Sequence, residues 1–113
     1  MPFINVKTNA AVSAQKEDSI KTALGQAITA IPGKSESWLM VGFEPEYKLY
    51  FKGTADPAAM VQVSIYGSAD RSAKNKLTGK ISEILGNELG ISPSRIYVSY
   101  AETPDWGWNG ANF

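Results

Sequence analysis

The N-terminal stretch MPFINV places a proline at the start of a segment that otherwise alternates like a β-strand. Proline cannot donate a hydrogen bond to a sheet, so a strand tolerates it at its first residue. A second interpretation is chemical. Removal of Met1, which is common before a small residue, makes Pro2 the N-terminus, with a secondary amine that can act as a base or nucleophile. If Met1 is retained, that nitrogen is an amide. These residues alone leave both interpretations open.

The chain contains no histidine and no cysteine. This excludes disulfides, thiol nucleophiles, Ser-His-Asp triads and nearly all zinc sites. Acid-base chemistry near neutral pH must therefore come from a carboxylate, lysine, tyrosine or terminal amine whose pKa is shifted. Eleven basic residues balance eleven acidic ones, so bulk charge predicts neither a nucleic-acid partner nor an anionic membrane partner.

The overall composition is that of a globular protein: 113 residues, 43% apolar and 19% charged. This length predicts one domain spanning residues 1–113. The first residues lack the apolar core of a signal peptide, and no segment has the length of a transmembrane helix. We therefore expect a cytoplasmic protein.

Apolar residues recur at helical spacing in two segments. Residues 15–31 are expected to form a helix that Ser13 caps and Pro32-Gly33 ends. Residues 72–89 are expected to form a second helix that ends at Gly90. The predicted buried faces are Ile20, Leu24, Ala27, Ile28 and Ile31 in the first helix, and Leu77, Ile81, Ile84, Leu85 and Leu89 in the second.

The two helical segments belong to a longer repeat. Adding 57 to a position in the first half gives a matching residue in the second without a gap, as for Ile4 and Val61, Ile20 and Leu77, Gly33 and Gly90, and Val41 and Val98. Two copies of this length predict a duplicated strand–helix–strand unit, each with a right-handed crossover. The expected fold is α/β, of the α+β kind: two βαβ units related by a pseudo-twofold, forming a four-stranded mixed sheet with both helices on one face. Residues 47–52 and 106–109 are candidates for short extra strands.

Strand parity predicts which residues face the helices. Ile4, Val6, Val61, Val63, Ile65, Ile96, Val98 and Tyr100 share that face. The opposite face carries Phe3, Asn5, Gln62, Ser64, Tyr97 and Ser99, with apolar surface added by Trp38 and Met40. A face this mixed is usually covered, and a second copy of the chain is the simplest cover. We therefore expect a homo-oligomer.

Several motifs coincide along the chain. Pro2 opens a strand, Gly33-Lys34 follows the first helix, and Ser64-Ile65 closes the third main strand. The C-terminal half contains GISPSRIYVSY, from Gly90 to Tyr100, and GWNGANF, from Gly107 to Phe113. Together these resemble the macrophage migration inhibitory factor (MIF) family of the tautomerase superfamily, over essentially the whole chain. The C-terminal segments are specific to that family, and Pro2 with Lys34 is its functional signature.

The resemblance implies a homotrimer whose three sheets surround a central channel. The implied activity is keto–enol tautomerisation of phenylpyruvate-like α-keto acids and dopachrome-type compounds, with no cofactor and no metal. Several family members also act as secreted cytokines without a signal peptide. A cell-surface receptor and non-classical export are therefore implied as well.

The resemblance also implies roles for individual residues. Pro2 would be the catalytic base, because burial and the nearby Lys34 cation lower the pKa of an amine towards neutrality. Lys34 would also bind the substrate carboxylate. Phe3, Ile65, Trp108 and Phe113 would form an apolar wall, Ser64 and Ile65 would offer mainly backbone groups, and Tyr97 and Ser99 would come from a neighbouring subunit.

Three departures from the family pattern bear on function. The stretch that matches the CxxC motif of vertebrate members is Pro57-Ala58-Ala59-Met60, so thiol–disulfide activity should be absent. The active-site asparagine is Ser99 here, which has a shorter reach. The segment that usually reads Ser-Ile-Gly-Gly contains Tyr66, whose bulk is expected to narrow the pocket or alter the range of substrates.

Two other functions stay open. One is a cytokine-like binding protein whose pocket is vestigial, in which case replacing Pro2 would spare partner binding. The other is a structural or interaction module of ferredoxin-like shape, which a monomer without a pocket would favour.

Overall fold

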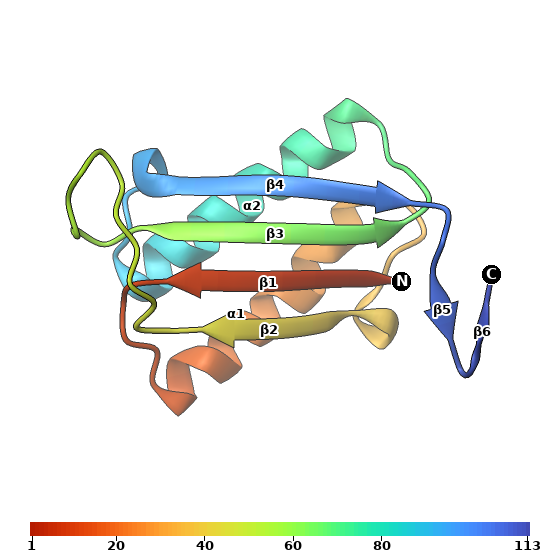
Figure 1. The fold of residues 1–113 in the computed structure, drawn as a ribbon, viewed down its shortest axis with the longest axis horizontal. Coiled ribbons are helices and arrows are strands. Elements are labelled where there is room, and N and C mark those ends of the chain that lie inside the picture. The colour runs from red at the N-terminus through yellow and green to blue at the C-terminus, as the bar shows by residue number, and fades with distance from the viewer.

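Four strands form one mixed sheet in the order β2-β1-β3-β4 in the computed structural model, which describes residues 1–113. The two outer pairs, β1 with β2 and β3 with β4, are parallel, and the inner pair is antiparallel. Figure 1 shows both helices behind the same face of this sheet. The strands are β1 (Pro2–Thr8), β2 (Met40–Glu44), β3 (Ala59–Tyr66) and β4 (Ile96–Thr103).

The strand register confirms the 57-residue repeat. Ile4 pairs with Val41 in the first unit, and Val61 pairs with Val98 in the second. Each partner in the second pair lies 57 positions after its counterpart in the first. The two units meet where β1 pairs with β3, and Asn5 opposite Gln62 marks the pseudo-twofold axis. The predicted two-layer architecture is therefore confirmed.

The two helices begin in the same way but end differently. Helix α1 (Ala14–Ala27) is capped by Ser13, and α2 (Arg71–Leu89) is capped by Asp70. Helix α2 ends at Gly90, which adopts the left-handed conformation. Helix α1 ends before the predicted residue 31, because its last turn tightens into a 3-10 helix, η1 (Ile28–Ala30).

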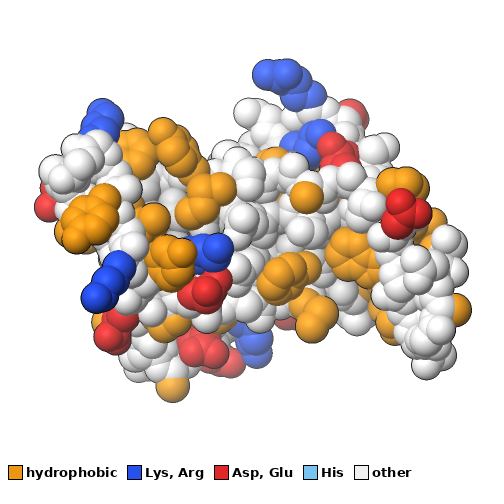
Figure 2. Space-filling view, in the orientation of Figure 1, with side chains coloured by type: hydrophobic (Ala, Val, Ile, Leu, Met, Phe, Trp, Pro, Cys, Tyr) orange, Lys and Arg blue, Asp and Glu red, His pale blue; other side chains and the backbone are white.

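The core lies between the sheet and the helices. Sixteen buried residues form it, and they include six of the eight strand positions predicted to face the helices. Ile84 and Leu89, predicted on the buried face of the second helix, are only half-buried. Val98 and Tyr100 are half-buried on the same side, and the Tyr100 hydroxyl donates to the Lys74 carbonyl of α2 at 2.8 Å. The opposite face, seen in Figure 2, carries hydrophobic side chains interspersed with polar ones.

The segments that follow each unit differ from their prediction. Residues 47–52 form no strand, because Lys52 and Gly53 both have positive φ and make a tight turn closed by the isolated bridge between Phe51 and Thr54. Residues 106–109 contribute only β5 (Gly107–Trp108), which pairs with β6 (Ala111–Asn112) in a separate two-stranded hairpin. Two further 3-10 turns precede β2 and β4: η2 (Glu36–Trp38) and η3 (Pro93–Arg95).

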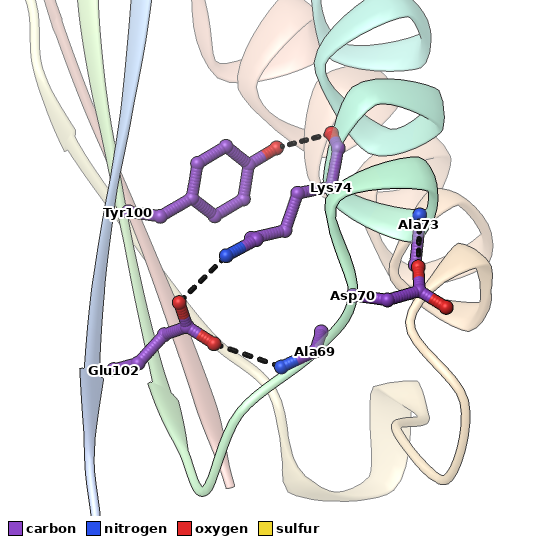
Figure 3. Close-up of polar contacts among 6 residues, drawn as sticks. All are labelled: Ala69, Asp70, Ala73, Lys74, Tyr100 and Glu102. Carbon is purple, nitrogen blue, oxygen red and sulfur yellow. Dashed lines mark hydrogen bonds and ion pairs between the residues drawn. The ribbon is translucent and has the colours of Figure 1, made fainter.

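A polar clamp joins β4 to the start of α2, as Figure 3 shows. The Glu102 carboxylate accepts from Lys74 Nζ at 2.6 Å and from the Ala69 N–H at 2.8 Å. The Gly67 N–H donates to the Thr103 carbonyl at 2.8 Å. These contacts fix the loop between β3 and α2, which leaves the sheet beside the N-terminus.

No helix of the structure has the length and apolar character needed to cross a membrane.

Candidate functional site

The N-terminus lies at an edge of the sheet where several elements meet. Pro2, the first residue of β1, pairs with Ile65 near the end of β3, and Phe3 pairs with Met40 at the start of β2. Figure 1 places the β5–β6 hairpin at the same end of the molecule as the N-terminus. Pro2 is buried in this setting.

A pocket of about 390 Å³ opens beside Pro2, between the turn that precedes β2 and the C-terminal hairpin. All three tryptophans of the chain line it, and the Trp38 and Trp108 rings meet edge to face with centroids 5.3 Å apart. Three of its nine lining residues are therefore aromatic, and an aryl group could pack against them. The lining residues are Met1, Pro2, Ser37, Trp38, Leu39, Met40, Trp106, Gly107 and Trp108.

A tight turn brings Lys34 to this site. The Lys34 N–H donates to the Ile31 carbonyl at 3.1 Å, and Gly33 between them has φ 79°. Proline followed by a glycine of positive φ is the signature of a type II turn, so Pro32-Gly33 shapes the turn that follows η1. The Lys34 side chain then crosses to β3, where Nζ donates to the Tyr66 carbonyl at 2.9 Å.

The electrostatics of the site favour an uncharged amine. Burial, and then the neighbouring Lys34 ammonium, lower the pKa of the Met1 α-amino group below its ordinary value of 8.0. Both effects disfavour the ammonium form, since one removes water and the other adds a like charge. At neutral pH, a larger fraction of such an amine is uncharged than at an exposed terminus. An amine at this end of β1 is therefore better able to act as a general base.

Six of the predicted site residues lie around this end of the sheet with Pro2. Phe3 and Ser64 pair with each other on the open face and are half-buried. Trp108 lines the pocket, and Phe113 stacks on it with ring centroids 6.4 Å apart. Lys34 lies next to the N-terminus, as described above. Ile65 differs from its predicted place in the wall: its side chain is fully buried in the core, so only its backbone can face a ligand.

Tyr97 and Ser99 lie away from Pro2 within one chain. Pro2 pairs with Ile65, which is opposite Glu102 on β4, whereas Tyr97 is opposite Met60. Five residues of strand correspond to about 16 Å. Tyr97 instead packs edge to face on Phe51, with centroids 5.1 Å apart, and is 61% exposed. The chain does not bring these two residues to its own pocket.

Sequence reasoning did not assign the pocket residues Ser37, Trp38, Leu39 and Met40 to the site. A signal was available, because β1 and β2 are parallel and the residues that precede β2 must lie beside those that precede β1. Trp106 was likewise missed as a lining residue.

No group of three or more carboxylate side chains is placed to hold a metal ion.

Taken together, two βαβ units in one sheet and a pocket at the N-terminal amine define a pseudosymmetric two-layer α+β domain with its site at the chain terminus. The family model described as "Macrophage migration inhibitory factor (MIF)" matches residues 1–113. The chain therefore belongs to the MIF family.

Individual relatives agree with this placement. The crystal structure of MIF2 from Leishmania major is 34% identical, with a TM-score of 0.94, and covers 100% of this chain and 97% of that one. Macrophage migration inhibitory factor from Meriones unguiculatus is 29% identical over 100% of this chain and 99% of its own length. A more distant structure, Pt0534 inactivated by 2-oxo-3-pentynoate, is 18% identical with a TM-score of 0.84, covers 96% and 93% of the two chains, and shares the fold.

Proposed function

We propose that this chain is a MIF-like keto–enol tautomerase, a single domain over residues 1–113 that acts on phenylpyruvate-type α-keto acids and dopachrome-like compounds. After Met1 is removed, the Pro2 amine is the general base. The observation that carries the proposal is the position of Pro2 at a pocket lined by three tryptophans, at the end of β1 where burial and Lys34 lower the pKa of the Met1 α-amino group. Pro2 is itself buried. Once removal of Met1 makes its nitrogen the terminal amine, we expect burial and the Lys34 charge to lower the pKa of that amine too.

The reaction needs only proton transfers. In the enolising direction the Pro2 nitrogen takes a proton from the carbon next to the keto group, and the C–H electron pair shifts towards the keto oxygen. A proton added to that oxygen completes the enol, so substrate and product contain the same atoms. Lys34 binds the carboxylate of the α-keto acid as a point charge. The tryptophan-lined pocket receives its aryl group.

The site is completed by assembly as a homotrimer. The mixed open face of the sheet is left uncovered in a single chain, and Met40 on it is 69% exposed. Tyr97 and Ser99 lie too far along β4 to reach Pro2 of their own chain, so a neighbouring subunit supplies them. Tyr97 then contacts the reacting oxygen or the aryl ring, and Ser99 is a weaker hydrogen-bond partner.

Enol–keto interconversion of phenylpyruvate tests the proposal once intact mass has shown that Met1 is absent. Pro2→Gly should lower the rate by orders of magnitude, because glycine loses the secondary amine, while circular dichroism stays unchanged. A matched control inserts one alanine between Met1 and Pro2, which converts the Pro2 nitrogen to an amide without altering its ring. No activity in protein with a free Pro2 amine would overturn the proposal.

Covalent trapping provides a second test. The reagent 2-oxo-3-pentynoate combines an α-keto acid with an electrophilic triple bond. The Pro2 nitrogen would add to the alkyne carbon, a proton would go to the adjacent carbon, and the protein would gain the full mass of the reagent. Peptide mapping should place the adduct on Pro2, and the alanine-insertion control should remain unlabelled. An adduct on a lysine alone would contradict the assignment of the base.

A second candidate function follows from the names of the relatives. The rodent relatives at 28–29% identity are named for inhibiting the migration of macrophages, which corresponds to a cytokine-like role with a cell-surface receptor as partner. Under this alternative the Pro2→Gly protein keeps its effect on migrating cells although it has lost tautomerase activity.

A further inference from the structure

The C-terminal hairpin forms one wall of the pocket, but the backbone hydrogen bonds within it are too few to hold it in place. Each of its strands is two residues long, and it pairs with no strand of the main sheet. Its turn is made by Asn109 and Gly110, both with positive φ, and every residue from 107 to 113 is exposed. An isolated hairpin of this size is not stable in water, so contacts with the rest of the molecule must position it.

Two aromatic pairs make those contacts. Trp108 meets Trp38 of the turn before β2 at 5.3 Å. At the other end of the hairpin, Phe113 meets Tyr66 at 5.0 Å, with the ring planes inclined at 37°. The Phe113 N–H donates to the Trp106 carbonyl at 3.0 Å, so the position of Phe113 is transmitted to the pocket-lining tryptophans.

Tyr66 also contacts the chemical part of the site. Its N–H donates to the Met1 carbonyl at 3.1 Å, and its carbonyl accepts from Lys34 Nζ at 2.9 Å. Lys34 Nζ lies 5.9 Å from the centroid of the Tyr66 ring, within the range of a cation–π contact. One residue at the end of β3 is therefore joined both to Lys34, which the proposed function assigns to substrate binding, and to the hairpin wall. These two contacts do not involve Met1 and so remain when Met1 is removed.

We infer that Tyr66 is a positioning residue that seats the C-terminal hairpin against the pocket and thereby determines which aryl groups the site admits. This rests on the proposed function, since the aryl groups are those of α-keto acids. With the Tyr66 ring present, Tyr66 holds Phe113, Phe113 stacks on Trp108, and Trp108 stays against Trp38 at the edge of the pocket. Without it, the hairpin keeps only its Trp38 contact and can swing outwards.

Tryptophan fluorescence tests the seating without any need for activity, because all three tryptophans of the chain line this pocket. Tyr66→Ala should raise the acrylamide quenching constant about twofold, and Tyr66→Phe should match wild type because it keeps the ring. Phe113→Ala should give at least the increase of Tyr66→Ala, because it also removes the ring stacked on Trp108. The double variant should match Phe113→Ala alone, since Tyr66 acts through Phe113. Unchanged quenching in Tyr66→Ala, or additive effects in the double variant, would overturn the inference.

Substrate selectivity tests the consequence. Tyr66→Ala should raise the ratio of kcat/KM for indolepyruvate to that for phenylpyruvate about threefold or more, chiefly through KM. Tyr66→Phe should leave the ratio unchanged. An equal loss of kcat on both substrates would show a merely structural role and refute the claim about selectivity. If wild-type protein turns over neither substrate, the selectivity claim falls with the proposed function, and the quenching experiment alone decides the seating.

Discussion

The proposed function gives Lys34 two separable roles at the N-terminus. Its ammonium disfavours a second positive charge on the terminal amine, and it offers a partner to a substrate carboxylate. The first role affects the pKa of the base, and the second affects substrate affinity. Burial is a larger cause of the lowered pKa of the terminal amine than Lys34 is. Removing Lys34 alone should therefore separate its effect on that pKa from the effect of burial.

Lys34→Met should therefore raise the pKa of the Pro2 amine. The ascending limb of the plot of kcat/KM against pH should move to higher pH, while its midpoint stays below that of an exposed amine because burial remains. KM for phenylpyruvate should also rise. Lys76→Met, on the exposed part of α2, serves as the matched control and should leave the profile in place. A midpoint that stays put or falls would contradict the role given to Lys34.

Glu102 provides a pH-dependent contact at the residue scale. The hydrogen bond from Lys74 and the one from the Ala69 N–H lower its pKa below the ordinary value of 4.5. A carboxyl group with a depressed folded-state pKa stabilises the fold above the unfolded-state pKa, and that stabilisation is lost as the pH falls through the folded-state value. The clamp in Figure 3 should thus weaken only in acid.

Thermal unfolding of Glu102→Gln against wild type measures this contribution. The variant should have the lower Tm at about pH 7. The difference should shrink as the pH falls from the unfolded-state pKa, about 4.5, through the lower folded-state pKa of Glu102. Glu83→Gln, at an exposed position of α2 without an ion pair, should leave Tm close to wild type. A Tm difference that persists undiminished in acid would show that charge on Glu102 is not its cause.

At the scale of the elements, the helix ends show how local residues decide the path of the chain. Gly90 ends α2 in the left-handed conformation, so the chain turns directly towards η3 and β4. Helix α1 has no glycine at its last residue and tightens through η1 instead, which leaves Pro32-Gly33 to make the turn that presents Lys34. The two units therefore share a topology, but only the first delivers a lysine to the site.

Two glycines, one within α2 and one at its C-cap, predict opposite effects of the same substitution. Gly90→Ala forces a Cβ into the left-handed region, at φ 67°, and should lower the free energy of unfolding by about 1–2 kcal/mol. Gly79→Ala lies within the helix, where an added Cβ meets nothing within 4 Å, and should raise it by about 0.5–1 kcal/mol. Urea unfolding measures both. If both variants were destabilised alike, backbone conformation would not be the explanation.

At the scale of the whole molecule, two residues of the proposed site, Pro2 and Tyr97, lie at opposite ends of the sheet, on either side of the pseudo-twofold axis at Asn5 and Gln62. Pro2 lies where β3 and β4 end, and Tyr97 lies where β4 begins. One chain cannot fold these ends together, because a strand is stiff over its length. The proposed site is therefore completed only where one copy meets the next.

Subunit complementation tests this arrangement. Pro2→Gly and Tyr97→Ala chains should each have little activity, whereas refolding them together in equal amounts should restore about a quarter of the wild-type sites, since each site needs an intact Pro2 from one chain and an intact Tyr97 from its neighbour. Sedimentation of wild type should show a trimer at micromolar concentration. Absence of any recovery in mixed trimers would place both residues in the same chain's site or remove Tyr97 from it.

The sequence by itself determined the sheet, the helices, the repeat and the location of the core, because these follow from apolar spacing and from caps that act within a few residues. Through its resemblance to the MIF family, it also predicted Pro2, Lys34, Trp108 and Phe113 as site residues. Only the tertiary structure decided that Trp38 and Trp106 line the pocket, that the Ile65 side chain belongs to the core, and that residues 47–52 turn back on themselves. Those outcomes depend on which strand ends meet and on carbonyl groups satisfied by distant side chains such as Asn9 and Arg95. Pairings between residues 40 or more positions apart leave no periodic trace in the chain.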